Sequence, residues 1–143
     1  MIFYLLMGTK SLSVRRYLLV LAVLYTCVIT WLSLAKVFIP IDIKVEGSDK
    51  IGHFLAYFVF AIVWFLPFFF SRKQPMSFSK SLWLSAIFGF LFGLLMEFFQ
   101  AVLTSYRNSD WNDVLANTSG IILAVIVMVV LKNKLVSFRM KVS

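Results

Sequence analysis

The chain has 143 residues, of which 62% are apolar and 16 are phenylalanine, and its mean hydropathy is +0.94. A soluble domain of this length cannot bury so much hydrocarbon, so the composition excludes a soluble globular protein and predicts a membrane protein. The net charge of +8 does not indicate nucleic-acid binding, because the basic residues stand in short clusters beside apolar runs. The single cysteine, Cys27, excludes an intramolecular disulfide and a cysteine metal cluster.

The chain begins with a basic leader, residues 1–16, which contains Lys10, Arg15 and Arg16 and no acid. Its short apolar start cannot cross a bilayer, so we expect a cytoplasmic or interfacial segment. Four longer apolar runs follow, and each is close to the ~20 residues that a membrane-spanning helix needs. They cover residues 17–35, 51–70, 82–103 and 114–131.

The first of these runs has the basic flank and the small-residue end of a signal peptide. It is longer than the ~7–15 apolar residues of a signal sequence, so we interpret it as a first transmembrane helix. In the second run, Pro67 predicts a kink or an early end of the helix. The sequence therefore predicts an all-α, polytopic membrane protein, a single domain over residues 1–143 with four transmembrane helices in a compact bundle.

The charged residues divide the segments between these helices into two groups. The N-terminal segment, the loop at 71–81 and the C-terminal tail hold ten Lys and Arg residues and no acid. All six acids lie in the other two loops or in the helix ends that border them. Because Lys and Arg are enriched on the cytoplasmic side of membranes, we expect both termini in the cytoplasm and the acidic side outside.

Polar residues occur where three of the predicted helices reach the outer side. They are Asp49, Lys50, His53 and Tyr57 in the second helix, Glu97 and Gln100 in the third, and Asp113 and Asn117 in the fourth. Within each helix the spacing of three or four residues places polar side chains on one stripe, with Tyr57 and Glu97 deepest. Ionisable groups within hydrocarbon are costly and are functional-site hypotheses by default. We expect the three stripes to meet in one polar site.

Small residues recur every four positions along the third helix and lead into its carboxylate. The small residues are Ser85, Gly89, Gly93 and Ala101, and Glu97 stands in the same four-residue series. Such a strip allows helices to approach one another closely. We therefore predict helix packing at Gly89, Gly93 and Gly120, either within one chain or between copies in a homo-oligomer.

For His53 the residues leave three interpretations open, which are structural pairing with Asp49 or Glu97, acid–base or head-group contact, and metal ligation. A lone histidine with scattered carboxylates lacks the recurrent spacing of zinc sites, so we predict no metal and no cofactor. A carboxylate placed as Glu97 is must be paired, be neutral or face water, and we favour a functional role over a structural one.

The start of the fourth helix leaves similar alternatives. Asp110 or Asp113 could cap the helix, whereas Asn117 lies too deep for a cap and is expected to bond a neighbouring helix. Arg107 could clamp a phosphate or carboxylate with two hydrogen bonds, or pair with Asp110 or Asp113.

Three segments carry motifs of a known family. They read D-K-I-G-H-F-x-x-Y, E-F-F-Q and R-N-S-D-W-x-D-V-x-x-N-x-x-G, at the start of the second run, the end of the third and the entry to the fourth. In this order they resemble the VanZ-like family of small bacterial membrane proteins, over residues 49–131. The first third of the chain matches only in having an apolar span. By position, the motif residues are Asp49, Lys50, His53, Tyr57, Glu97, Gln100, Arg107, Asp110, Asp113, Asn117 and Gly120.

The resemblance implies a multi-pass protein of the bacterial cytoplasmic membrane, and for the family's namesake resistance to teicoplanin rather than vancomycin. Our leading hypothesis is that the outer polar residues engage an envelope lipid, a lipid-linked wall precursor or the lipid-tailed glycopeptide. Lys50 and Arg107 would meet anionic groups, and Glu97, His53 and Asp113 would serve as hydrogen-bond or acid–base groups.

Two other classes of function stay open. One is a hydrolase or transferase acting on an envelope lipid, with His53 as base, Glu97 as acid and Asp113 as a further catalytic candidate. The chain has no G-x-S-x-G nucleophile motif, which weighs against this reading. The other is a proton-coupled transporter, although the acids gather toward one face of the predicted bundle.

Overall fold

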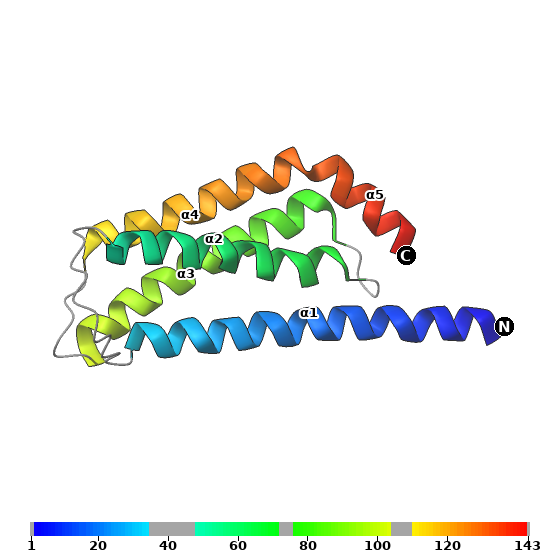
Figure 1. The fold of residues 1–143 in the computed structure, drawn as a ribbon, viewed down its shortest axis with the longest axis horizontal. Coiled ribbons are helices and arrows are strands. Elements are labelled where there is room, and N and C mark those ends of the chain that lie inside the picture. The colour runs from blue at the N-terminus through cyan, green and yellow to red at the C-terminus, as the bar shows by residue number, and fades with distance from the viewer. Residues whose placement is uncertain (1, 35–47, 72–75, 104–109, 143) are drawn as a thin grey trace.

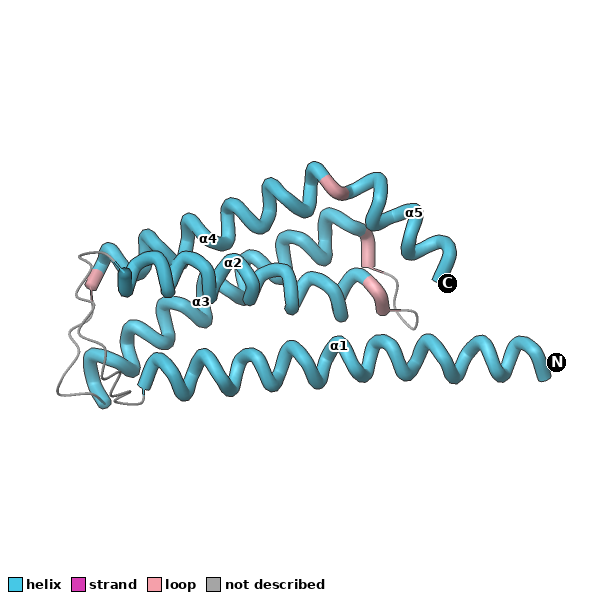
Figure 2. Tube along the Cα trace, in the orientation of Figure 1, coloured by secondary structure: helices cyan, strands magenta, loops and turns pink. Residues whose placement is uncertain are grey.

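The computed structural model describes residues 2–34, 48–71, 76–103 and 110–142, and helix is the only regular secondary structure among them (Figures 1 and 2). In chain order the helices are α1 (Ile2–Leu34), α2 (Ser48–Phe69), α3 (Phe78–Leu103), α4 (Trp111–Val130) and α5 (Lys132–Val142). Four of them contain stretches long and apolar enough to cross a membrane, namely Val14–Leu34, Asp49–Phe69, Phe78–Leu103 and Trp111–Val130. The all-helical class and the four apolar helices packed as a bundle are therefore confirmed.

All four spanning helices begin earlier than their apolar runs, and polar side chains cap the starts of α3 and α4. The Ser77 hydroxyl accepts a hydrogen bond from the backbone N–H of Lys80 at 3.2 Å, so α3 begins at Phe78. The Asp110 carboxylate accepts from the backbone N–H of Asn112 at 2.9 Å, so α4 begins at Trp111. At the other end of α2, the helix ends two residues after Pro67, which agrees with the predicted early end.

The first helix, α1, is peripheral to the bundle. Only 11% of the residues in its apolar stretch are buried by the chain, compared with 33% in α4. Two hydrogen bonds fasten it to α2: the Tyr25 hydroxyl donates to the Ala56 carbonyl at 2.9 Å, and the Trp64 indole N–H donates to the Thr26 hydroxyl at 3.0 Å. The helix begins at Ile2, so the leader predicted as a separate segment is continuous with the first span.

The closest helix pair is α2 with α4, and Gly120 is the reason. A Cβ atom at Gly120 would overlap the backbone carbonyl of Phe54, so only glycine permits this approach. The glycines of α3 have a different role, since Gly89 makes room for the side chains of Phe60 and Ile121. The small-residue strip of α3 thus receives side chains from α2 and α4, and its glycines are used within the chain.

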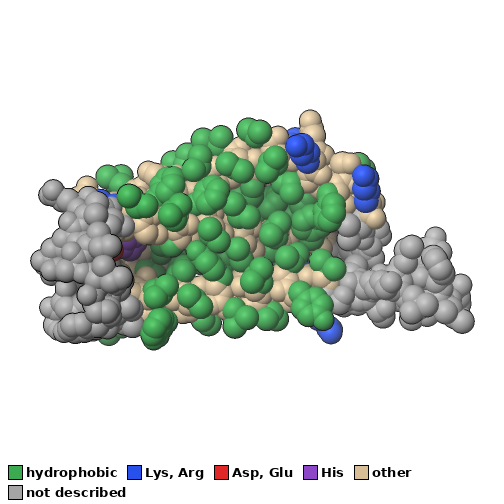
Figure 3. Space-filling model, in the orientation of Figure 1, with side chains coloured by type: hydrophobic (Ala, Val, Ile, Leu, Met, Phe, Trp, Pro, Cys, Tyr) green, Lys and Arg blue, Asp and Glu red, His purple; other side chains and the backbone are tan. Residues whose placement is uncertain are grey.

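The C-terminal helix α5 was not predicted, because it is short and polar. It folds back toward the start of α3, where the Arg139 guanidinium donates to the Met76 carbonyl at 2.9 Å and lies 4.7 Å from the ring centroid of Phe69. The first residues of α1 and the last of α5 lie at the same end of the bundle (Figure 1). In the view of Figure 3, hydrophobic side chains cover the middle of the molecule, and Lys and Arg side chains gather toward that end.

Candidate functional site

The opposite end of the bundle brings together the end of α1, the start of α2, the end of α3 and the start of α4 (Figure 1). Side chains from α2 and from the start of α4 meet there, and we call them the membrane-edge cluster. Its members are Asp49, Lys50, His53, Asp110, Asp113 and Asn117. Of the three polar stripes that we expected to meet in one site, those of the second and fourth helices supply this cluster.

The outer layer of the cluster is an ion bridge between α2 and α4. The Lys50 ammonium lies 2.9 Å from Asp110 Oδ2 and 3.3 Å from Asp113 Oδ1. Its hydrogen bond to Asp110, together with that from the backbone N–H of Asn112, lowers the pKa of the Asp110 carboxyl to about 2. Asp110 therefore caps α4, as predicted, and also pairs with the neighbouring helix.

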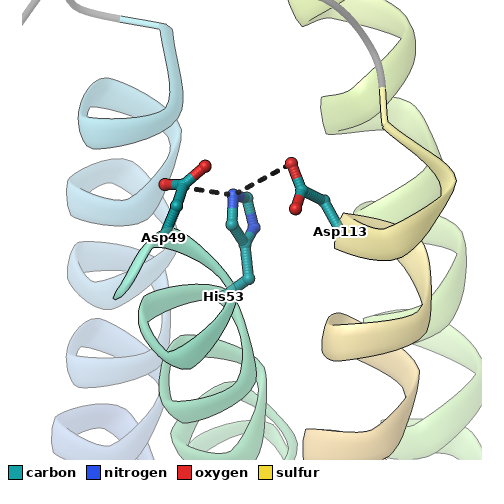
Figure 4. Close-up of side chains that lie close together, drawn as sticks. All are labelled: Asp49, His53 and Asp113. Atoms are coloured by element: carbon teal, nitrogen blue, oxygen red, sulfur yellow. Dashed lines mark ion pairs between the residues drawn. The ribbon is translucent and has the colours of Figure 1, made fainter. Parts of the chain in front are cut away.

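The inner layer is built around His53. Its Nδ1 lies 3.1 Å from the amide oxygen of Asn117, which is an acceptor, so with this amide orientation Nδ1 carries the proton. This bond confirms that Asn117 contacts a neighbouring helix rather than capping its own. The other ring nitrogen, Nε2, lies 3.9 Å from Asp49 Oδ1 and 3.8 Å from Asp113 Oδ2 (Figure 4). The pairing of His53 with Asp49 was among the predicted alternatives, whereas its pairing with Asp113 was not predicted.

One helical turn deeper, the polar residues continue toward the middle of the bundle. Tyr57 is 3% exposed and Glu97 is 4% exposed, in agreement with their expected depth. A Cβ atom at Gly93 would lie 3.1 Å from the Tyr57 ring and 3.5 Å from the amide nitrogen of Asn117. The Tyr57 hydroxyl and the Asn117 amide nitrogen make no hydrogen bond within the described part of the chain. Polar groups thus extend inward from the cluster along α2 and α4.

Another predicted site residue, Gln100, contacts α1 rather than the members of the cluster named above. The amide of Gln100 donates to the backbone carbonyl of Ser33 at 3.1 Å, so this residue ties the end of α3 to the end of α1. Arg107 lies outside the described residues. The contribution of the Ser33 carbonyl was missed by sequence reasoning, because a backbone acceptor leaves no trace in the sequence.

The charges of the cluster limit what it can bind. With a neutral imidazole, three carboxylates face one ammonium, and Lys50 already contacts two of the three. A site with this excess of negative charge attracts cations and hydrogen-bond donors and repels a bare phosphate. In the structure Lys50 contacts Asp110 and Asp113, and its expected contact with an anionic ligand stays a prediction.

Comparison with known proteins identifies the family to which the chain belongs. The family model described as VanZ/LLP1 matches residues 1–132, which include the first span as well as the motif region. Among curated proteins, an uncharacterized protein of Schizosaccharomyces pombe is 28% identical over 130 residues, covering 90% of this chain and 74% of the relative. No solved structure shows a significant match to the chain.

Proposed function

Since the chain belongs to the VanZ/LLP1 family, we propose that it is a multi-pass membrane protein whose membrane-edge cluster binds the polar head of a membrane amphiphile. One observation carries the proposal: a polar site lies at the end of a bundle whose flanks are apolar. The Asp49 side chain is 57% exposed and that of Lys50 is 43% exposed, above a His53 that is 10% exposed. A head group can meet these side chains while its tail lies along the exposed apolar residues of α2 and α4.

The charge of the cluster selects among head groups. An amino group or a set of hydroxyls fits three carboxylates and one ammonium better than a bare phosphate does. An envelope lipid, a lipid-linked wall precursor and a lipoglycopeptide such as teicoplanin each offer such groups beside a hydrocarbon chain.

Lipid retention by the purified protein tests the proposal. The wild type, His53→Ala and Ser119→Ala would be purified in mild detergent, and the lipids that remain bound would be identified by mass spectrometry. Ser119 is an exposed residue of α4, two positions from Asn117, and serves as the matched control. We expect one lipid class to be enriched in the wild type and the control, and reduced at least tenfold in His53→Ala. Equal retention by all three proteins would contradict the proposal.

Catalysis on a bound lipid is the second candidate, and the fixed imidazole favours it. Asn117 holds one ring nitrogen of His53, which leaves the lone pair of Nε2 available to accept a proton, as a general base must. The retained lipids distinguish the two functions, because an enzyme would convert added lipid of the same class and His53→Ala would not. Proton-coupled transport gains no support from the described residues, whose acids all lie toward one end of the bundle.

A further inference from the structure

We infer that Asp49, His53 and Asp113 form a binding site for one divalent transition-metal ion of the zinc class. The inference stands on the geometry of these side chains and does not rest on the proposed function. Each residue offers one ligand atom, and the three atoms lie within 4.8 Å of one another. They come from two helices, so no spacing along the sequence indicates the site.

The distances within the site suit an ion better than hydrogen bonds. His53 Nε2 lies 3.9 Å from Asp49 Oδ1 and 3.8 Å from Asp113 Oδ2, beyond the ~2.7–3.2 Å of a hydrogen bond. Bonds of ~2.0–2.2 Å to a shared zinc ion hold ligand atoms about 3.4 Å apart. The two distances from Nε2 exceed this separation by about half an ångström, and all three ligand atoms lie within 4.8 Å of one another, so small side-chain rotations would place an ion between them.

The orientation of His53 is an independent observation that points to a ligand. Its side chain is nine-tenths buried, and Nε2 is directed between the two carboxylates in Figure 4. The proton on Nδ1 is committed to the amide oxygen of Asn117, so Nε2 presents its lone pair. Metal-binding histidines commonly donate their second ring N–H to such an acceptor, which fixes the tautomer and the ring. Asn117 is thus a positioning residue.

The charges agree with a cation and give its chemical class. One imidazole nitrogen and two carboxylate oxygens are ligands of catalytic zinc sites, which keep a further position open for water or another ligand. Asp113 contributes Oδ2 to this site while its Oδ1 contacts the Lys50 ammonium at 3.3 Å. Lys50 is therefore the cation that competes electrostatically with the metal, and removing its charge should strengthen metal binding.

Metal titration of the purified full chain tests the inference. Protein stripped with a chelator would be titrated with Co²⁺, whose visible absorption reports tetrahedral ligation, and then with Zn²⁺ in competition. We expect one ion per chain in the wild type and in Ser119→Ala. The affinity for Co²⁺ should fall at least 100-fold in His53→Ala and in Asp113→Asn. It should fall about 10- to 100-fold in Asn117→Ala, as it does when other residues that hydrogen-bond a metal ligand are replaced.

Lys50→Met separates metal binding from a purely structural cluster. If the site binds metal, this variant should bind Co²⁺ several-fold more tightly than the wild type, a gain that a misfolded protein cannot produce. Wild-type affinity no higher than that of His53→Ala, or weaker binding by Lys50→Met, would overturn the inference. Circular dichroism of each variant would verify that its helices are intact.

Discussion

Asp113 divides its carboxylate between two partners on α2, with Oδ1 toward Lys50 and Oδ2 toward His53. The place of Asp113 on the polar stripe was predicted from the sequence, but its pairing with Lys50 and His53 was not. The pairing depends on how α2 is rotated against α4, and that rotation is fixed by the contact between Gly120 and the Phe54 carbonyl. His53 directly precedes Phe54, and Asn117 is nearly one turn before Gly120, so the contact brings these two side chains together.

The carboxyl group of Asp110 should titrate with a pKa far below its ordinary value of 3.8. Its pKa of about 2 arises first from the hydrogen bond with Lys50 and then from the backbone N–H of Asn112. Because the folded-state pKa is lowered, the pair contributes stability that is fully present above pH 3.8 and lost as the pH falls to about 2. Carbon-13 NMR of the carboxyl group in detergent micelles would measure the titration.

Lys50→Met is the variant that tests this cause. The substitution removes the hydrogen bond with Lys50, which lowers the pKa of Asp110 the most, so this pKa should rise toward 3.8. It should remain below 3.8 because the hydrogen bond from the backbone N–H of Asn112 persists. Ser119→Ala, the exposed control on α4, should leave the titration unchanged. A wild-type carboxyl that titrates at its ordinary value would show that the bridge between α2 and α4 does not form in solution.

Among the elements, the α2–α4 pair defines the site and α1 is an accessory. The lengths of the apolar runs predicted the four spans, because a bilayer imposes a length on every helix that crosses it. Early starts were harder to predict, since caps such as Asp110 are polar residues outside the apolar runs. The helix α5 has a polar composition and is held by Arg139 on Phe69 and Met76, contacts that only the fold creates.

Two glycines test the packing of this helix pair with the same substitution. At Gly52 on α2, a Cβ atom would meet nothing within 4 Å, so Gly52→Ala should raise the free energy of unfolding by up to ~1 kcal/mol through helix propensity. At Gly120, a Cβ atom would overlap the Phe54 carbonyl, so Gly120→Ala should lower it by ~1–3 kcal/mol or more. Thermal unfolding in detergent, followed by tryptophan fluorescence, would measure both changes.

The opposite signs are the essential result of this comparison. No loss of stability in Gly120→Ala would indicate that the α2–α4 approach is looser than the structure shows. Gly120→Ala should also disturb the membrane-edge cluster, because it pushes His53 away from Asn117. The NMR titration of Asp110 in Gly120→Ala would then differ from that in the wild type, whereas the titration in Gly52→Ala would be unchanged.

For the whole molecule, the two ends of the bundle differ in charge as the sequence predicted. The described acids lie at the end that holds the membrane-edge cluster, and the Lys and Arg residues of α5 lie at the other. The first residues of α1 and the last of α5 lie at the same end of the bundle in Figure 1, and four spans would place both on one side of a membrane. The bias of basic residues to the cytoplasm supports our proposal that this side is cytoplasmic.

Labelling of single cysteines in intact cells would test that orientation. Cys27 is the chain's only cysteine and is exposed, so the background variant is Cys27→Ala. Into it we would introduce Asn112→Cys beside the cluster and Asn133→Cys in α5, both at exposed positions. A membrane-impermeant maleimide should label the first in intact cells and the second only after permeabilisation.

The reverse labelling pattern would place the membrane-edge cluster on the cytoplasmic side. That result would change which ligands the cluster could meet. Lipid-linked wall precursors on the outer leaflet and glycopeptides outside the cell could not then reach His53, so both would cease to be candidate ligands. Metal binding would survive, because Asp49, His53 and Asp113 form the same site on either side. Orientation therefore decides which amphiphiles are candidates, while the fold alone decides whether the cluster can hold a cation.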